Sequence, residues 1–281
     1  MTLHDHSVAP TQRQLNEAHV YDERAAALAE KLSDDDLRLD PATPPFPNRE
    51  HIDFLTFALE RLGSLAGRRV LETGCGTGTL TTWFAMQGAR SVGIDVSNGN
   101  LGVAERRARV NGVASSATFL NAPVERLDHA DGSYDAIIGN QVLHHFELPE
   151  AMANISRLLA PGGTAVFCEP VLFVPEIFRW LRNSRAVTRF FPSVADTPDE
   201  RSLSMREVEI IKSAFGSFEM HPFQLTTRVQ NFRPLSDDAF ARLERVDRII
   251  LKLPVSRRLS RYVVFVVSGA PGTINLEEGS K

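Results

Sequence analysis

The sequence has few of the features that mark secreted, membrane-spanning or nucleic-acid-binding proteins. It contains two cysteines in 281 residues, too few for a disulfide framework and consistent with a reducing cytoplasm. No apolar run reaches the length needed to cross a membrane, and residues 1–10 are polar, unlike a signal peptide. The formal net charge of -4 provides no basic field for nucleic acid. These absences predict a globular, cytoplasmic protein.

What the sequence does contain is a glycine-rich turn between a strand and a helix. An apolar run over residues 69–71 ends at Glu72, and Gly74, Gly76 and Gly78 follow at alternate positions before a helical pattern begins. This order opens a doubly wound α/β domain. Glycine lets the backbone turn sharply and approach a ligand closely, and the helix N-terminus offers free N–H groups.

Three side chains around this turn select the kind of ligand. Thr79 stands where the dinucleotide fingerprint has its last glycine, which argues against NAD. Glu72 would repel a pyrophosphate but suits an ammonium or sulfonium group. Asp95 ends the next predicted strand, where a carboxylate can accept hydrogen bonds from both hydroxyls of a ribose. A ligand with a ribose and a cationic amino-acid part is therefore expected.

The motif over residues 72–78, Glu-x-Gly-x-Gly-x-Gly, together with Asp95, resembles the class I, Rossmann-like S-adenosylmethionine (SAM)-dependent methyltransferases of the small-molecule type. Residues 134–140 (Tyr-Asp-Ala-Ile-Ile-Gly-Asn) and 158–163 (Leu-Leu-Ala-Pro-Gly-Gly) are also similar to that family. The resemblance implies a doubly wound, seven-stranded, mostly parallel sheet in the order 3-2-1-4-5-7-6, with helical lid insertions.

Four regions are expected along the chain. Residues 1–48 form an N-terminal helical cap, residues 49–170 the SAM-binding core, residues 171–270 the rest of the core with helical acceptor-lid insertions, and residues 271–281 a loose tail. The hydrophobic patterns predict helices over 11–32, 48–62, 100–110, 149–159, 205–215 and 237–253 and after Gly78, and strands over 69–72, 91–95, 117–120, 136–138, 164–168, 218–227 and 262–267.

The resemblance implies SAM as the cofactor and assigns residues around it. The backbone over residues 72–75 and Gly76 would surround the methionine part, and Asp95 would hold the ribose. Asn140 would lie near the amino group. Tyr21 resembles the tyrosine that closes over SAM in relatives, with an ordinary helix-surface position as the alternative. The predicted cofactor-binding residues are Tyr21, Glu72, Thr73, Gly74, Cys75, Gly76, Gly78, Asp95, Val96, Ala122, Val124 and Asn140.

One position departs from the family at the adenine end of the site. Pro123 stands where relatives often carry an acid that accepts a hydrogen bond from adenine. The adenine contacts would then come from Val96, from the Val124 N–H, and from the apolar faces of Ala122 and Val124. Glu125 is a substitute for the missing acid, although an orientation toward solvent is the favoured alternative.

Methyl transfer from a sulfonium needs mainly positioning, with a base when the acceptor must lose a proton. The base candidates are His144, His145 and Glu169, which follow the fourth and fifth strands. Each has a structural alternative, since the two histidines are common in relatives without a catalytic role and the carboxylate can cap a loop. No metal is predicted, because the histidines and Glu147 fit no zinc spacing. Cys168 is expected to be a buried thiol.

The acceptor is expected to be a small, fairly apolar molecule. The aromatic-rich residues 171–204 and the helix at 237–253 add material at the acceptor end. Residues 249–261 are apolar and basic, which favours a packed helix with a solvated basic end over contact with a membrane or a lipid-like acceptor.

The predicted reaction is O-methylation of a specialised metabolite or of a lipid- or quinone-like molecule. The alternatives are N- or C-methylation of such a molecule and a SAM-binding regulator without catalysis. An RNA or protein acceptor is disfavoured by the acidic charge. The expected partner is a small molecule, with no nucleic acid and no stable membrane insertion, and a homodimer is left open.

Overall fold

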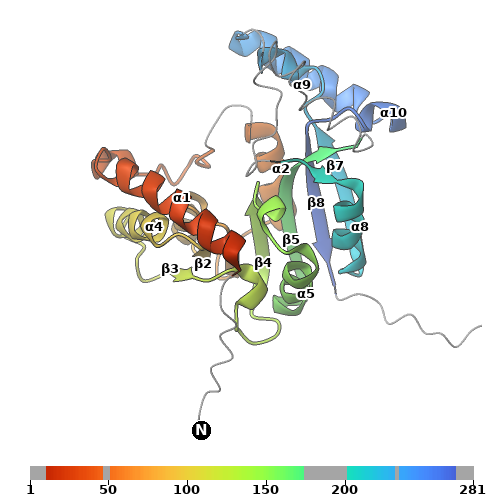
Figure 1. The fold of residues 1–281 in the computed structure, drawn as a ribbon. Coiled ribbons are helices and arrows are strands. Elements are labelled where there is room, and N and C mark those ends of the chain that lie inside the picture. The colour runs from red at the N-terminus through yellow and green to blue at the C-terminus, as the bar shows by residue number, and fades with distance from the viewer. Residues whose placement is uncertain (1–10, 47–50, 174–200, 232–233, 270–281) are drawn as a thin grey trace, which may run out of the picture.

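The structure is a computed structural model that describes residues 11–46, 51–173, 201–231 and 234–269. Its centre is a mostly parallel sheet with helices on both faces (Figure 1). The strands are β1 (Arg69–Thr73), β2 (Arg90–Asp95), β3 (Ala117–Asn121), β4 (Tyr134–Asn140), β5 (Leu159–Leu172), β6 (Leu203–Ser204), β7 (Ser217–Phe223) and β8 (Tyr262–Ser268).

The strand order is β3-β2-β1-β4-β5-β8-β7, and β6 pairs with the end of β5. β8 is antiparallel to both of its neighbours, whereas the pairs from β3 to β5 are parallel. The order predicted from the resemblance is therefore confirmed, since β8 and β7 are the predicted strands seven and six. The two-residue strand β6 was not predicted.

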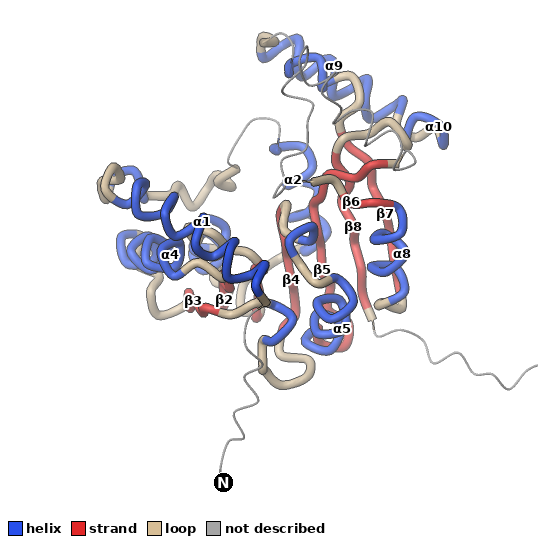
Figure 2. The backbone as a smooth tube through the Cα atoms, viewed as in Figure 1, coloured by secondary structure: helices blue, strands red, loops and turns tan. Residues whose placement is uncertain are grey.

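The helices surround this sheet and occupy different ends of it. Figure 2 shows α1 and α4 together beside β2 and β3, and α9 and α10 near β7 and β8. The helices are α1 (Gln12–Ala29), α2 (Ile52–Leu62), α3 (Thr79–Met86), α4 (Asn98–Val110), α5 (Leu148–Leu158), α8 (Met205–Ser213), α9 (Asp237–Ile250) and α10 (Pro254–Arg257), with 3-10 turns η1 (Asp35–Leu37), η3 (Val124–Arg126), η4 (Leu143–His145) and η6 (Thr227–Asn231).

Two apolar cores pack on opposite faces of the sheet. Alternate strand residues point to opposite sides, so Ile137 and Phe167 lie in one core while Ile138 and Val166 lie in the other. α5 and α8 cover the first core, and α2 and α3 cover the second. Because both faces are covered, the central strands read as continuous apolar runs, as in β8, where residues 262–267 are all buried.

The N-terminal helix is shorter than predicted, and it buries fewer of the apolar side chains that gave the helical pattern. α1 starts after Thr11, whose side chain forms a reciprocal capping box with Gln14. Ala25 is buried, and a Cβ at Gly99 in α4 would lie 3.0 Å from its side chain. Leu15 and Leu28, which also produced the helical periodicity, are exposed. α1 thus packs on α4 through small side chains rather than through its leucines.

Other differences concern the ends of elements. The strand predicted over 218–227 ends at Phe223, where Gln224 follows with a φ of 60°. β5 continues past Cys168 to Leu172 and pairs there with β6. The start of the helix predicted over 48–62, most of the insert 171–204 and the tail 271–281 lie outside the described residues. Within the described ranges, no helix combines the length and hydropathy of a membrane span.

Candidate functional site

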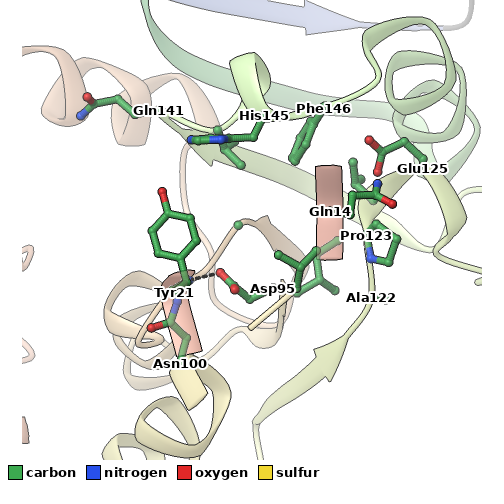
Figure 3. A pocket seen from close by; sticks show the side chains of 16 residues that line it. Gln14, Tyr21, Asp95, Asn100, Ala122, Pro123, Glu125, Gln141, His145 and Phe146 are labelled. Carbon is green, nitrogen blue, oxygen red and sulfur yellow. Dashed lines mark hydrogen bonds between the residues drawn. The ribbon is translucent and has the colours of Figure 1, made fainter. Parts of the chain in front are cut away.

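A cleft lies beneath α1 at the carboxyl ends of β1, β2 and β4 (Figure 3). This edge of a doubly wound sheet is where ligands bind. Seven of the fourteen side chains that line the cleft are polar, and the other seven are aliphatic or aromatic. The lining residues are Gln14, Tyr21, Gly74, Gly76, Ile94, Asp95, Val96, Asn100, Ala122, Pro123, Val124, Glu125, Gln141, Val142, His145 and Phe146.

The glycine turn forms the floor of the cleft. Gly74 and Gly76 have φ angles of 65° and 51°, in the left-handed region that favours glycine. A Cβ on Gly74 would lie 2.4 Å from Val142 Cγ2, so this position excludes any side chain. No atom lies within 4 Å of the Cβ position of Gly76. A ligand can therefore approach the Gly76 backbone directly.

The third glycine has a packing role instead. Gly78 precedes α3 with a φ of 71° and is not among the cleft-lining residues. A Cβ there would lie 2.5 Å from the Cβ of Ala104 in α4 and 2.7 Å from the ring of Phe119 in β3. Gly78 lets α3 pack against its neighbours, and this packing holds the glycine turn in place.

The strand-end acid at β2 lines the cleft. Asp95 Oδ2 accepts a hydrogen bond from the Gly76 N–H at 2.8 Å, and its Oδ1 accepts one from the Ser97 N–H at 2.9 Å. Burial raises the pKa of the Asp95 carboxyl, and these hydrogen bonds oppose the shift. The Asn121 amide donates to the backbone carbonyl of Val96 at 2.8 Å. The acid is thereby held beside the glycine floor.

Glu72 lies behind the glycine turn rather than in the lining. Its Oε2 accepts hydrogen bonds from the N–H of Thr81, at 2.7 Å, and from the hydroxyl of that residue. Burial raises the pKa of Glu72 to about 8. Besides Gly78, three other predicted cofactor residues are likewise absent from the lining, namely Thr73, Cys75 and Asn140. Thr73 donates its hydroxyl proton to the carbonyl of Ile138 at 3.3 Å.

The far wall of the cleft contains the position that departs from the family. Pro123 lines this wall between Ala122 and Val124, and Glu125 lines it as well. Glu125 Oε1 accepts a hydrogen bond from the Glu147 N–H at 2.8 Å. Its Oε2 is buried with no hydrogen-bond partner among the described residues, and burial raises the pKa of this carboxyl. The favoured expectation that Glu125 faces solvent is therefore wrong.

Polar side chains gather at the other end of the cleft. Figure 3 shows the ring of Tyr21 extending from α1 toward His145, with the ring centroids 6.3 Å apart. Gln141 has a φ of 54°, an unusual value for a residue with a side chain. Its amide lies 3.3 Å from Nε2 of His51, and the Tyr262 hydroxyl donates to its Oε1 at 3.4 Å. These groups can contact a polar atom of an acceptor.

The three predicted base candidates are separated by the fold. His145 lines the cleft, but His144 is buried and its Nδ1 lies 2.9 Å from Glu169 Oε2. Glu169 Oε1 accepts hydrogen bonds from the N–H groups of Val142 and Leu143 at 2.6 and 2.7 Å. Because the carboxylate of Glu169 is fully buried and engaged, it positions the loop that carries His145. Cys168 is a fully buried thiol.

α1 is fixed over the cleft at two points. Near its start, Arg13 donates to the backbone carbonyl of His144 at 2.6 Å. In its middle, Asp22 Oδ1 accepts hydrogen bonds from the Ser97 hydroxyl at 2.6 Å and from the Gly99 N–H at 2.8 Å. These contacts join the helix to the loop after β4 and to the start of α4. They explain how Tyr21 reaches the cleft.

Sequence reasoning missed several of these residues. Gln14, Asn100 and Gln141 line the cleft, and Asp22 anchors its cap. Gln141 directly follows the predicted strand-end residue Asn140, which was a usable signal. The others stand on helices, where the sequence does not reveal which face meets the cleft. Among the described residues, no cluster of His, Cys, Asp and Glu is arranged to hold a metal ion.

The sheet order, the glycine floor and the strand-end acid together define the class I methyltransferase architecture. Residues 71–167 match the family described as a methyltransferase domain. The ubiquinone biosynthesis O-methyltransferase of Bordetella parapertussis is 28% identical over 208 residues, which cover 71% of this chain and 83% of that protein. The methyltransferase GfsG of Streptomyces halstedii is 35% identical over 115 residues, 40% of this chain and 41% of its own.

Solved structures share the fold. The geranyl diphosphate C-methyltransferase of Streptomyces coelicolor A3(2) has a TM-score of 0.58 at 17% identity, covering 92% of this chain and 99% of that chain. The [4+2]-cyclase SpnF has a TM-score of 0.58 at 19% identity, covering 94% and 98%. Residues 71–167 are therefore a methyltransferase domain, and together with the shared fold they support a class I SAM-dependent methyltransferase that uses SAM as its cofactor. The glycine floor, which a Cβ would obstruct, fits such a cofactor.

Proposed function

We propose that this enzyme transfers the methyl group of SAM to an oxygen of a small, fairly apolar molecule. The observation that carries the proposal is the division of the cleft. One end has the glycine backbone and the strand-end acid Asp95, and the other combines the apolar Val142 with Tyr21, Gln141 and His145. An apolar pocket with a few converging polar groups is typical of small-molecule sites.

Within this proposal, the glycine floor holds the methionine part of the cofactor. Gly74 and Gly76 present backbone to it, and Asp95 accepts hydrogen bonds from the ribose. Glu72 is buried next to the same turn, and the cationic part of the cofactor favours the ionised form of this carboxyl when it binds. Thr73, Cys75 and Gly78 support the shape of the turn. When bound, SAM supplies a methyl group already activated on a sulfonium.

The adenine end requires a substitute for the missing acid. Val96, Ala122 and Val124 provide apolar surface for the ring. Pro123 has no polar side chain, but Glu125 faces the same cleft with one oxygen unpaired among the described residues. An amino group on a purine is a suitable donor to that oxygen. We therefore assign Glu125 the hydrogen bond that relatives make with the acid at the position of Pro123.

His145 is the proposed base for the acceptor hydroxyl. It is the only one of the three candidates that lines the cleft among the described residues. Histidine exchanges protons in the neutral pH range, and an alcohol or phenol acceptor must lose a proton. Tyr21 closes the cleft from α1, and Asn140 at the end of β4 is assigned to the amino-group side of the cofactor. The name of the Bordetella parapertussis relative, a ubiquinone biosynthesis O-methyltransferase, supports an oxygen acceptor.

The proposal is tested with methyl-labelled SAM, purified full-length protein and an extract of the source cell. Products are divided into organic-soluble, water-soluble and macromolecular fractions, and the labelled product is hydrolysed to identify the methylated atom. Label on an oxygen of an organic-soluble molecule is the expected result. Asp95→Ala, which is expected to bind SAM poorly, serves as the matched control for transfer by contaminating enzymes.

If the label is found elsewhere, each result supports a different function. Label on nitrogen or carbon would retain a small-molecule methyltransferase with a different acceptor atom. Label in RNA or protein would overturn the small-molecule acceptor. SAM binding measured by calorimetry without transfer in any fraction would favour a regulator that binds SAM without catalysis.

A further inference from the structure

One surface of the molecule exposes large aliphatic side chains close together along the chain. Val246 and Ile249 in α9 are 40% and 69% exposed, and Leu253, Val255 and Leu259 are 60%, 78% and 53% exposed. Val246 and Ile249 are three residues apart in α9 and lie on one side of that helix, and Leu253 follows in the turn that leads into α10. We call these five residues the α9–α10 surface. Soluble monomers rarely leave such a cluster open to water without a use.

Basic side chains flank this apolar surface. Residues 241–261 contain seven arginine or lysine residues and two acidic ones, whereas the whole chain has a net charge of -4. One of the two acids, Asp247, is buried and does not contribute to the exposed face. Arg242, Lys252 and Arg258 are exposed on the same segment. The segment therefore has a strongly positive face within an acidic protein.

The surface is held rigidly at the edge of the fold where the parallel strands end. The two carboxylate oxygens of Asp247 accept hydrogen bonds from the N–H groups and hydroxyls of Thr226 and Thr227. The Arg261 N–H donates to the carbonyls of Phe223 and Gln224, at the end of β7. Figure 1 shows α9 and α10 beyond the ends of β7 and β8. The apolar side chains are thus presented outward from a fixed platform.

The charge of the surface distinguishes three binding partners, which are a second copy of the chain, a nucleic acid and a lipid bilayer. In a symmetric dimer the same patch meets its own copy, so the basic side chains of both chains would face each other and repel. A nucleic acid would attract the arginines but would leave the aliphatic side chains against phosphate and water. An anionic bilayer satisfies both components, because apolar side chains enter the acyl boundary while Arg and Lys contact the headgroups.

We propose that the α9–α10 surface docks the enzyme reversibly on an anionic lipid membrane. The contact is peripheral, with Ile249, Leu253 and Val255 inserted shallowly and Lys252 and Arg258 at the headgroups. It is independent of which acceptor the enzyme methylates, since it uses none of the cleft residues. Each basic residue near such a membrane strengthens binding by about fivefold at physiological salt.

The test is flotation of the full-length protein with lipid vesicles. Vesicles of phosphatidylglycerol and phosphatidylcholine are compared with vesicles of phosphatidylcholine alone. The expected result is binding to the anionic vesicles, weakening as salt is raised. Lys252→Glu combined with Arg258→Glu is expected to lower the partition constant more than about 25-fold. Ile249→Asp combined with Val255→Asp is expected to lower binding at low and high salt alike.

The matched control carries the same two kinds of substitution elsewhere. Leu28→Asp with Lys31→Glu, at the exposed end of α1, should bind vesicles like the unmodified protein. SAM affinity of every variant is measured by calorimetry, so that misfolding is recognised. Absence of binding to anionic vesicles, equal binding to neutral ones, or binding that both α9–α10 variants retain would overturn the proposal. Self-association that these variants abolish would reassign the surface to a second copy of the chain.

Discussion

The two ends of the cleft are built in different ways. At the proposed cofactor end, the cleft is lined by the glycine turn and by Asp95, whose oxygens accept hydrogen bonds from backbone N–H groups. At the acceptor end, Tyr21, Gln141 and His145 come from α1 and from the loop after β4. The backbone geometry of the glycine turn follows from a short local motif. The side chains at the acceptor end come together only when segments distant in the sequence pack against each other. The first end therefore suits one shared cofactor, and the second can vary with the acceptor.

The largest expected effect is at the acceptor end. His145→Ala should lower kcat by at least about 100-fold for a hydroxyl acceptor, because no positioned base then removes the proton of the acceptor hydroxyl. The SAM dissociation constant should stay unchanged. Steady-state kinetics across pH and calorimetry measure the two quantities, and His19→Ala, an exposed histidine of α1, is the control. Full turnover with an unaltered pH profile would remove His145 from the reaction.

At the cofactor end, Asp95→Ala should weaken SAM binding by about 50-fold. The change removes the charged ribose acceptor and also releases the N–H groups of Gly76 and Ser97. Calorimetric titration with SAM measures the loss. Asp35→Ala, which removes an exposed carboxylate at the start of η1, should leave the affinity unchanged. An unchanged dissociation constant for Asp95→Ala would mean that the ribose lies elsewhere.

The packing behind the cofactor end can be tested with two glycines. Gly78→Ala should lower the free energy of unfolding by about 2 kcal/mol, because φ is 71° and the new Cβ would press on Ala104. Gly102→Ala, in α4 where a Cβ meets no atom within 4 Å, should raise it by about 0.5 kcal/mol. Denaturant unfolding compares the pair. Equal effects of the two substitutions would contradict the packing role of Gly78.

The smallest expected effect is a pH dependence from Glu72. Burial raises its pKa to about 8 from 4.5, so its contribution to folding is full below pH 4.5 and is lost as pH rises through 8. A cationic cofactor favours the ionised carboxylate, so SAM binding should release a proton. Affinity should increase by about tenfold between pH 6.5 and 8.5.

Calorimetry in buffers of different ionisation enthalpy measures this proton release. Glu72→Gln preserves the shape of the side chain and is expected to remove the pH dependence. A slope that persists in Glu72→Gln would assign the proton to another group, for which Asp95 is the nearest candidate because burial also raises its pKa.

Much of the fold was predictable because it follows from local patterns. The apolar run before Glu72, the glycines and the acid after the second strand appear in a fixed order, and the strand order followed from the resemblance. The α1 cap was predictable as a helix but not in its orientation. Its periodicity came partly from Leu15 and Leu28, which are exposed, while Ala25 and the Asp22 carboxylate make the contacts.

The candidate site likewise has features that local sequence predicts and features that depend on tertiary contacts. Glycines at alternate positions and an acid at a strand end predict a nucleoside-type cofactor without knowledge of any distant contact, because their geometry is local. Which of two adjacent histidines faces the cleft was settled only by tertiary structure, through the buried bond of His144 to Glu169. Likewise, only the packing of η3 turns Glu125 into the cleft, and only the fold leaves the aliphatic side chains of the α9–α10 surface exposed among the described residues. Burial and convergence depend on which surfaces meet, and the sequence of a single segment does not contain that information.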